Sequence, residues 1–315
     1  MSATAFDQQY IATGDGHALY VAQYGKPDAP AAVVLHGGPG SGTQPSVLDW
    51  FDLSRQRVVL FDQRGAGLSR PHGEISNNDS HKLVADIELL RTTLGIPHWM
   101  VVGGSWGATL ALLYAGSHSR QIDALILRGS FLASAREMQW FFQSLSAIVP
   151  AGCQRLTHGW SSVEKADVLG KLSGMLLHGD ADAASDAARR WSVYEDDIMR
   201  IMSGAAPRED DGNNNAPLNA RTLGKYRLQA HYLSNQCFTS EEHLLGIATM
   251  LVDVPCTIIH GTHDLVCPPE NASILARCMP HARLNWVGKG GHTPADPLIA
   301  KALSDAIRAH AHAGL

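Results

Sequence analysis

The chain has 315 residues, of which 45% are hydrophobic and 17% charged, an ordinary globular composition that can bury a large core. Its formal net charge is −5 and no Lys/Arg cluster stands out, which argues against nucleic acid or an anionic membrane as a partner, because both need a basic face. The apolar runs are strand-sized and far too short to span a bilayer.

The first part of the chain alternates short apolar runs with turn signals. Strands are expected at residues 20–24, 31–35, 57–61, 99–102 and 124–128, and helices at 80–94 and 109–115. The first helix is predicted from Leu83, Ile87 and Leu90, which recur at the spacing of an amphipathic helix. Strands that alternate with helices imply right-handed βαβ units and a mostly parallel, doubly wound sheet.

The character of the sequence changes after residue 130. Strand-like runs disappear and residues recur at helical spacing, which indicates an inserted helical cap. Within it, residues 203–219 are polar and rich in Gly, Pro and Asn, so they predict a mobile surface loop. Later elements are expected as strands at 256–260 and 283–287 and a helix at 295–310. The predicted organisation is an α/β core with a helical cap between its halves, divided at 1–130, 131–245 and 246–315.

The segment GGSWG at 103–107 fits the pattern GxSxG between a strand and a helix. Such a sharp turn holds the serine in a strained conformation that needs small neighbours, and it lifts the hydroxyl above the sheet. The amides that begin the new helix then face the reacting carbon. The alternative is a glycine-rich turn without chemistry. We interpret Ser105 as the nucleophile of an α/β-hydrolase fold.

A serine hydroxyl needs a general base, and the base needs an orienting carboxylate. In α/β-hydrolases the acid and then the histidine follow the serine, on loops after later strands. Asp264 and His292 each follow an expected strand, at the carboxyl edge where α/β sheets bind ligands. We therefore predict that Asp264 orients the base and that His292 acts as general base and then general acid.

Other candidates for these roles lie nearby in the sequence. Asp253 precedes its strand and would lie at the opposite edge of the sheet. We interpret His260, which ends a strand, and His263, which lines the loop, as structural residues. Cys267 has no base assigned to it and is interpreted as a packed thiol. Our hypothesis for this thiol is that alkylation of Cys267 blocks activity by displacing the loop that carries Asp264.

A tetrahedral intermediate needs hydrogen-bond donors for its oxyanion, each contributing roughly 3–4 kcal/mol. The amide of Trp106, the residue after the nucleophile, is expected to be one donor. The second is expected from HGGPG at 36–40, because glycine lets the backbone approach a ligand and proline cannot donate. We predict the N–H of Gly38 as this donor, with Gly37 lining the substrate site. The alternative for the loop is a tight turn that serves packing only.

Cysteine and histidine usage gives no sign of a metal site. The five cysteines are scattered and form no CxxC pair, which favours free thiols in a reducing compartment. The sixteen histidines form no HExxH or paired CxxC/HxxxH spacing. The first residues lack the basic and apolar regions of a signal peptide. We therefore expect a cytoplasmic protein whose chemistry needs no metal or organic cofactor.

Several segments together resemble the proline iminopeptidase (prolyl aminopeptidase) family of α/β-hydrolases. They are HGGPG at 36–40, FDQRGAGLS at 61–69, VADIELLR at 84–91, GGSWG at 103–107, LRGSF at 127–131, HGTHD at 260–264 and GGH at 290–292. The likeness spans essentially the whole chain. It implies a serine peptidase that removes N-terminal proline from small peptides, with a helical cap closing over the site.

The resemblance also implies where a substrate amine would bind. The family uses an acid in a WxxWE-like segment of the cap, and WSVYE at 191–195 gives this role to Glu195. An ordinary solvated acid is the alternative, because Asp196 and Asp197 follow it. The family typically has a second glutamate in an ARIENHY-like segment, where this chain carries Gln229. Glutamine accepts a hydrogen bond but contributes no charge, so the amine is held more weakly or the substrate has changed.

Three functions follow from these observations. The first is prolyl aminopeptidase activity, and the second is hydrolysis of a different small amide or ester on the same fold. The third is a binding protein that keeps a hydrolase scaffold without catalysis. An epoxide hydrolase or dehalogenase would need an aspartate at the position of Ser105. The expected assembly is a monomer or a small homo-oligomer.

Overall fold

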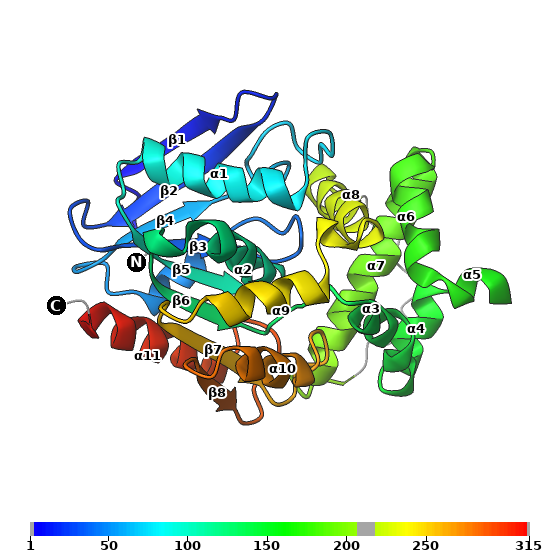
Figure 1. Ribbon diagram of the computed structural model, residues 1–315. Coiled ribbons are helices and arrows are strands. Elements are labelled where there is room, and N and C mark those ends of the chain that lie inside the picture. The colour runs from blue at the N-terminus through cyan, green and yellow to red at the C-terminus, as the bar shows by residue number, and fades with distance from the viewer. Residues whose placement is uncertain (1–2, 207–217, 314–315) are drawn as a thin grey trace.

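The computed structural model of the chain describes residues 3–206 and 218–313. Its central sheet has the strand order β1-β2-β4-β3-β5-β6-β7-β8 (Figure 1). The strands are β1 (Asp7–Ala12), β2 (Ala18–Gly25), β3 (Ala31–Leu35), β4 (Arg57–Phe61), β5 (Trp99–Gly104), β6 (Ile122–Arg128), β7 (Cys256–Gly261) and β8 (Arg283–Val287). β1, β2 and β4 pair antiparallel, and every pairing from β4 with β3 to β7 with β8 is parallel. This mostly parallel sheet confirms the predicted fold class.

The strands differ in how clearly their residues predict them. β3 reads AAVVL and is buried at every position, as expected for a parallel strand covered on both faces. β1 reads DQQYIA and lies at the edge of the sheet, where exposed positions alternate with half-buried positions and the buried Ile11. Sequence analysis did not predict β1, because an edge strand with one solvent-exposed face needs no continuous run of apolar residues.

Helices cover both faces of the sheet and extend beyond its carboxyl edge. The α-helices are α1 (Ser80–Thr93), α2 (Trp106–His118), α3 (Ala135–Phe142), α4 (Pro150–Leu156), α5 (Ser162–Ala166), α6 (Val168–His178), α7 (Ala181–Met202), α8 (Ala220–Ser234), α9 (Glu241–Met250), α10 (Glu270–Cys278) and α11 (Pro297–Ala313). The 3₁₀ helices are η1 (Pro45–Trp50), η2 (Ser119–Gln121), η3 (Ser144–Ala147) and η4 (Gln236–Phe238). The expected helices at 80–94, 109–115 and 295–310 correspond to α1, α2 and α11.

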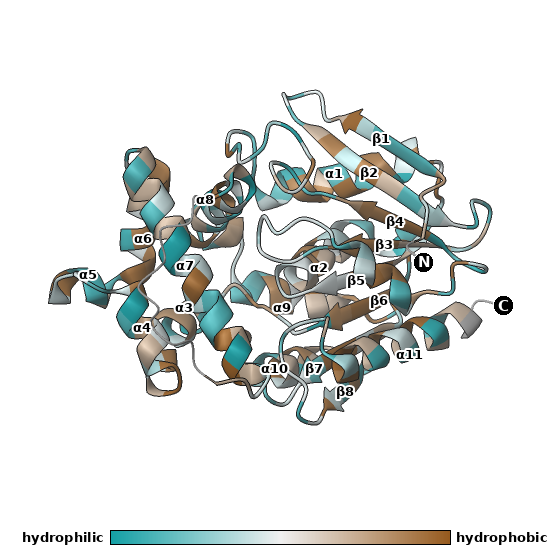
Figure 2. Ribbon diagram, turned by 180° about the vertical axis from the view of Figure 1, so that it is seen from behind, coloured by the Kyte–Doolittle hydropathy of each residue, from teal (hydrophilic) through white to brown (hydrophobic). Residues whose placement is uncertain are grey.

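The core consists of two apolar layers, one on each face of the sheet. α1, α2, α9 and α10 bury side chains such as Ile87, Leu110 and Leu275 against one face. η1 and α11 cover the other face with Trp50 and Leu303. The central strands are largely hydrophobic, which is visible in the brown colour of β5 and β6 (Figure 2). A sheet covered on both faces holds the loops at its carboxyl edge in fixed positions.

Helices α3 to α8 lie together at one side of the sheet (Figure 1) and share a separate apolar cluster around Trp191 and Leu172. The division of the chain at residues 131 and 245 stays a prediction. Residue 245 falls inside α9, whose Leu244 and Ile247 pack in the core rather than with α3 to α8. Most of the expected loop at 203–219 lies outside the described residues. In the described ranges, no helix combines the length and apolar character that crossing a membrane requires.

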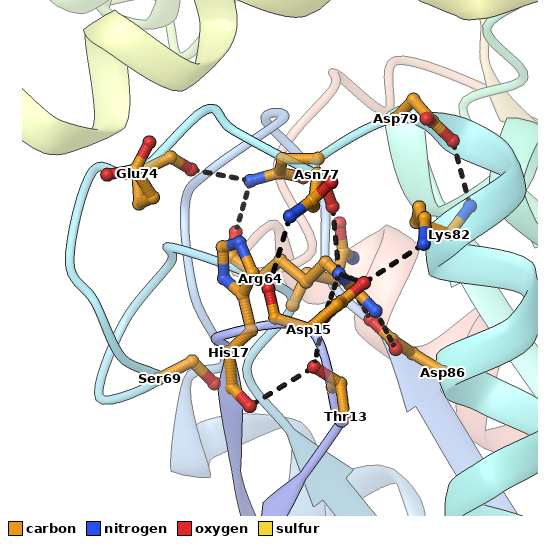
Figure 3. A network of polar contacts seen from close by, with 12 residues as sticks. Thr13, Asp15, His17, Arg64, Ser69, Glu74, Asn77, Asp79, Lys82 and Asp86 are labelled. Atoms are coloured by element: carbon orange, nitrogen blue, oxygen red, sulfur yellow. Dashed lines mark hydrogen bonds and ion pairs between the residues drawn. The ribbon is translucent and has the colours of Figure 1, made fainter.

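A polar network fixes the loop that follows β4, and Figure 3 shows its members. The buried guanidinium of Arg64 binds both carboxylate oxygens of Asp86 on α1, with Nε–Oδ2 at 2.6 Å and Nη2–Oδ1 at 2.7 Å. Its Nη1 binds both oxygens of Asp15, in the turn between β1 and β2, at 2.8 Å. Lys82 Nζ also reaches Asp15, at 3.0 Å. The Arg64 side chain therefore joins the β1–β2 turn, the loop after β4 and α1.

Candidate active site

Ser105 is the single residue between β5 and α2, and its backbone is strained. Its φ of 56° and ψ of −123° lie in a region that a residue with a side chain rarely adopts. The N–H of Ser105 donates to the carbonyl of Arg128 on β6 at 2.8 Å, which holds the turn against the sheet edge. The predicted serine therefore lies on a sharp strand-to-helix turn at the carboxyl end of β5.

The glycines around Ser105 are required by close backbone contacts. A Cβ on Gly103 would lie 2.2 Å from the carbonyl oxygen of Gly107. A Cβ on Gly107 would lie 2.0 Å from the carbonyl oxygen of Leu35 at the end of β3. Neither distance is possible for a real side chain, so the GxSxG spacing has a steric origin here.

Asp264 and His292 form a hydrogen-bonded pair on the loops after β7 and β8. His292 Nδ1 lies 2.7 Å from Asp264 Oδ2. The other oxygen of Asp264 accepts the backbone N–H groups of Val266 and Cys267, both at 2.9 Å. Because the carboxylate accepts at Nδ1–H, Nε2 of a neutral His292 is left as the basic nitrogen.

The surroundings of Asp264 favour its ionised form. Burial alone would raise the pKa of this carboxyl group, since its side chain is only 1% exposed. The charge and the hydrogen bond of His292, together with His260 and the Cys267 N–H, outweigh burial and lower the pKa below its usual value. Asp264 is therefore a carboxylate near neutral pH and can stabilise a positive charge on His292.

Two residues that sequence analysis did not single out support this pair. Arg128 Nη1 donates to the backbone carbonyl of His292 at 2.5 Å and so holds its loop. Gly129 has a φ of +55°, and a Cβ there would lie 3.2 Å from the imidazole of His292 and 3.3 Å from Asp264 Oδ2. Both lie in the LRGSF segment, so the motif was visible, but the contacts of its residues were not.

The other candidate residues near Asp264 and His292 have distinct environments. His260 is fully buried, accepts from the Ser130 N–H at 3.3 Å, and lies 3.0 Å from the Cys267 carbonyl. Burial lowers the pKa of His260, so it is a neutral, hydrogen-bonded core residue. His263 is exposed. Cys267 is buried with its Sγ 4.0 Å from Ser105 Oγ, and burial raises its pKa well above the usual value. A buried thiol of this kind is a poor nucleophile.

The HGGPG loop lies directly beside Ser105. A Cβ built on Gly37 would lie 3.5 Å from Ser105 Cβ, so the two backbones are in close contact. Gly38 has a φ of +121°, and a Cβ there would lie 2.6 Å from the Gly40 nitrogen, so this position requires glycine. Trp106 is the first residue of α2 and is completely buried. The structure thus places Gly37 against the backbone of Ser105, and Trp106 directly after the serine at the start of α2.

Gln63 connects this loop to Trp106 and was missed by sequence analysis. Its backbone N–H donates to His36 Nε2 at 2.9 Å, and its side-chain Nε2 donates to the His36 carbonyl at 2.8 Å. Its Oε1 accepts from Trp106 Nε1 at 2.9 Å. Gln63 is buried, and all three contacts join residues far apart in sequence. The segment FDQRG marked this position, but not which groups it would bind.

One cavity of about 1010 Å³ joins these residues to the helices beyond the sheet. Ser105, His292 and Gly38 line it from the sheet edge, and Glu195 and Gln229 line it from α7 and α8. Gln229 Nε2 donates to Glu195 Oε1 at 2.9 Å. The structure therefore brings the predicted substrate-binding side chains Glu195 and Gln229 together, in the cavity that Ser105 also lines.

The described part of the chain holds no disulfide or metal cluster. All five cysteines are free thiols. Within residues 3–206 and 218–313, no group of three or more His, Cys, Asp or Glu side chains could hold a metal ion. Of the hydrogen-bonded pair of Asp264 and His292, His292 lines the cavity, where its imidazole can transfer protons.

Comparison with known proteins agrees with this architecture. A family model for the alpha/beta hydrolase fold matches residues 30–296. A proline iminopeptidase from Xylella fastidiosa is 37% identical over 302 residues, which cover 95% of each chain. One from Arabidopsis thaliana is 37% identical over 296 residues, covering 93% of this chain and 77% of the relative. A crystal structure of a proline iminopeptidase from Mycobacterium smegmatis has the same fold, with a TM-score of 0.63 at 19% identity over 98% of this chain and 100% of that one. The chain therefore belongs to the proline iminopeptidase family of α/β-hydrolases, the family that its motifs resemble.

Proposed function

We propose that this protein is a serine hydrolase that releases N-terminal proline from small peptides through an acyl-enzyme on Ser105. The observation that carries the proposal is the 2.7 Å pair of Asp264 and His292, whose histidine lines one cavity with Ser105 and with the acid Glu195. The similarity to proline iminopeptidases along nearly the whole chain supports proline as the acyl group.

In the first half of the reaction, Ser105 Oγ attacks the carbonyl carbon of the N-terminal proline. Nε2 of His292 takes the hydroxyl proton, and the carboxylate of Asp264 stabilises the imidazolium that forms. The developing oxyanion accepts hydrogen bonds from the amides of Gly38 and Trp106. His292 then protonates the leaving nitrogen, the peptide bond breaks, and the shortened peptide departs.

In the second half, water replaces the departed peptide at the acyl-enzyme. His292 removes a proton from that water, which attacks the acyl carbon, and the oxyanion again binds at Gly38 and Trp106. Collapse of this intermediate returns the proton to Ser105 Oγ and releases proline. The cycle uses only groups of the chain and water.

A substrate with a free N-terminus carries a positive charge into this cavity. An unpaired charge is costly to bury, so an acid must face it. We assign this role to Glu195, with Gln229 as a neutral hydrogen-bond acceptor and Gly37 in contact with the proline ring. These assignments follow the cavity lining and the resemblance to the family.

The closest alternative is a hydrolase of the same fold that acts on another small amide or ester. The neutral Gln229, where a second acid is expected, favours it. We test the two by comparing kcat/KM for a free prolyl anilide, its N-acetylated form and a simple aryl ester. The proposal requires the free prolyl anilide to be the preferred substrate. A preference for the blocked amide or for the ester would favour the alternative.

A chemical label separates a serine hydrolase from a non-catalytic binding protein on the same scaffold. An activated serine reacts with fluorophosphonates, whereas an ordinary serine does not. We expect a single adduct on Ser105 that is lost when His292 is replaced by Ala. A protein that stays unlabelled would favour the binding function.

We further propose that residues 131–245 act as a cap on a core made of residues 1–130 and 246–315. The cavity is lined by residues of α7 and α8 and by residues at the sheet edge, which supports this division. Five free thiols are consistent with a cytoplasmic location. We propose that the protein works there as a monomer or a small homo-oligomer.

A further inference from the structure

The cavity that contains Ser105 extends in two directions. One part reaches α7 and α8, where Glu195 and Gln229 line it. The other part lies between η1 and α11, and α11 runs away from α7 and α8 towards the C-terminus (Figure 2). We call this second part the η1–α11 arm, and define it by the lining residues Val47, Trp50, Ala300, Leu303, Ser304 and Arg308.

The proposed reaction needs space for the substrate on the side of the η1–α11 arm. Proline is the first residue of the substrate, so no chain extends beyond the amine that is assigned to Glu195. The rest of the peptide lies across the scissile bond, and His292 must reach its nitrogen to protonate it. Thr293 and Ala295, which follow His292 and precede α11, also line the cavity. The leaving chain therefore starts beside His292 and faces the arm.

The arm is long enough for several residues of an extended chain. Its lining positions on α11 recur at the spacing of one helix face, as Ala300, Leu303, Ser304 and Arg308. The axial rise from Ala300 to Arg308 is about 12 Å, at 1.5 Å per residue. An extended peptide covers this length with about three residues. A tripeptide or tetrapeptide can thus have its whole leaving part beside α11.

The inner walls of the arm are apolar and shielded from water. Val47, Trp50 and Leu303 are 8%, 8% and 1% exposed. Val34 and Val102, near the carboxyl ends of β3 and β5, line the cavity and belong to the same apolar layer. Walls of this kind bind apolar groups by removing them from water and provide few partners for polar ones.

The outer end of the arm carries charges of both signs. Lys301 and Arg308 are exposed and line the cavity, and both pair with Asp305, at 2.5 Å and 2.9 Å. Asp49 on η1 is an exposed acid that also lines the cavity. Because each charge has an opposite charge on the same face or across the arm, this end does not select one sign. Selection among leaving peptides must then come from the apolar walls.

We infer that the η1–α11 arm binds the leaving peptide and favours an apolar residue directly after the N-terminal proline. This inference rests on the proposed function, because acyl transfer to Ser105 defines which part of the substrate leaves. A leucine after proline buries its side chain against Trp50 and Leu303. A glycine there has no side chain to bury, and an aspartate would bring a charge to apolar walls. The arm thus makes the residue after proline a determinant of specificity.

The first test uses the wild-type protein and three peptides, Pro-Leu-Gly, Pro-Gly-Gly and Pro-Asp-Gly. We expect kcat/KM for Pro-Leu-Gly to exceed the other two values by about tenfold or more, because burial of a leucine side chain supplies at least this factor. Chromatographic measurement of released proline gives all three values. Values that agree within about twofold would overturn the inference.

The second test fills the arm. Ala300→Leu adds a larger side chain to its wall and should lower kcat/KM for Pro-Leu-Gly by about tenfold or more. It should leave kcat/KM for prolinamide within about twofold, because the leaving group is then ammonia and does not enter the arm. Ser304→Leu, one turn further along α11, should have the same effect. Ala309→Leu is the matched control, since Ala309 is exposed on the same helix and is not among the described lining residues.

Prolinamide also reports whether each variant folds, because its hydrolysis needs an intact Ser105 and His292. Equal changes for Pro-Leu-Gly and prolinamide in both variants would overturn the inference. The proposed function would still stand in that case if the wild-type protein releases proline from these substrates. A wild-type protein that releases proline from none of them would overturn both.

Discussion

Gln63 shows how much of this site depends on residues that touch no substrate. Its side-chain amide holds the His36 carbonyl on one side and the Trp106 indole on the other. These groups flank the two amides proposed as oxyanion donors, Gly38 and Trp106. A shift of one donor weakens a hydrogen bond that forms fully only in the transition state. Gln63 is therefore a positioning residue.

We expect Gln63→Leu to lower kcat by about tenfold to a hundredfold while KM changes little, because transition-state stabilisation is what the donors supply. Steady-state kinetics with prolyl anilide measure this split. Gln8→Leu, on the exposed edge strand β1, is a control that should leave both constants unchanged. A rise in KM with constant kcat would instead place Gln63 in substrate binding.

The residues that could be predicted from sequence are those whose chemistry leaves a local pattern. Ser105 lies in a turn whose glycines are fixed by contacts with nearby backbone, and chain order then indicates Asp264 and His292. Gln63 left no comparable signal, because its partners His36 and Trp106 lie 27 and 43 residues away in the chain. Three-dimensional proximity was needed to find it.

At the scale of elements, Arg64 joins three segments through buried ion pairs (Figure 3). Its pair with Asp86 is almost fully buried, at 3% and 2% exposed. We expect Arg64→Met to lower the free energy of unfolding by about 3–5 kcal/mol, because it leaves the Asp86 carboxylate without its partner. Urea denaturation measures this loss. Arg120→Met, an exposed position on η2, should change stability by less than about 0.5 kcal/mol. Equal effects of the two variants would contradict this account.

The Asp15 carboxylate makes the same network sensitive to acid. Burial raises its pKa, but the hydrogen bonds from the Thr13 hydroxyl, Arg64 and Lys82 together outweigh burial and lower the pKa well below its usual value. As pH falls through about 4, the unfolded chain binds a proton at this position before the folded protein does, so the stability that Asp15 contributes is lost. We expect Asp15→Asn to cost roughly 1 kcal/mol at neutral pH and almost nothing at acid pH. Urea denaturation at several pH values checks this, and a cost independent of pH would contradict it.

Elements were predictable where burial imposes a pattern. The central strands β3 to β7 were found because both of their faces are covered. β1 was missed because one of its faces is exposed to solvent. α2 begins three residues before the predicted start, because the GGSWG turn leads directly into the helix. These are differences at edges and ends, where local composition carries little information.

At the scale of the whole molecule, the cavity between the sheet edge and helices α7 and α8 limits the substrate. A cavity of about 1010 Å³ accommodates a short peptide but not a folded chain. We expect kcat/KM for proline release from a short peptide to exceed that from a folded protein with the same N-terminal residues by at least about tenfold. Chromatographic measurement of released proline tests this. Equal rates would show that the helices do not restrict access.

The α/β core was predictable from sequence, but the shape of this cavity was not. The alternation of strands and helices fixes topology through general rules of handedness and packing. The cavity depends instead on how α7 and α8 sit over the sheet edge, which follows from side-chain packing around Trp191 and Tyr226. Amphipathic helical patterns indicate that such helices exist and not where they lie.

The central claim is that Ser105 forms the acyl-enzyme. It is tested most directly by the kcat of Ser105→Ala with prolyl anilide, measured on protein whose circular dichroism matches the wild type. We expect kcat to fall by about 10⁴-fold or more, because the nucleophile acts with His292 as a unit. A variant that keeps kcat within about tenfold of the wild-type value would contradict this account.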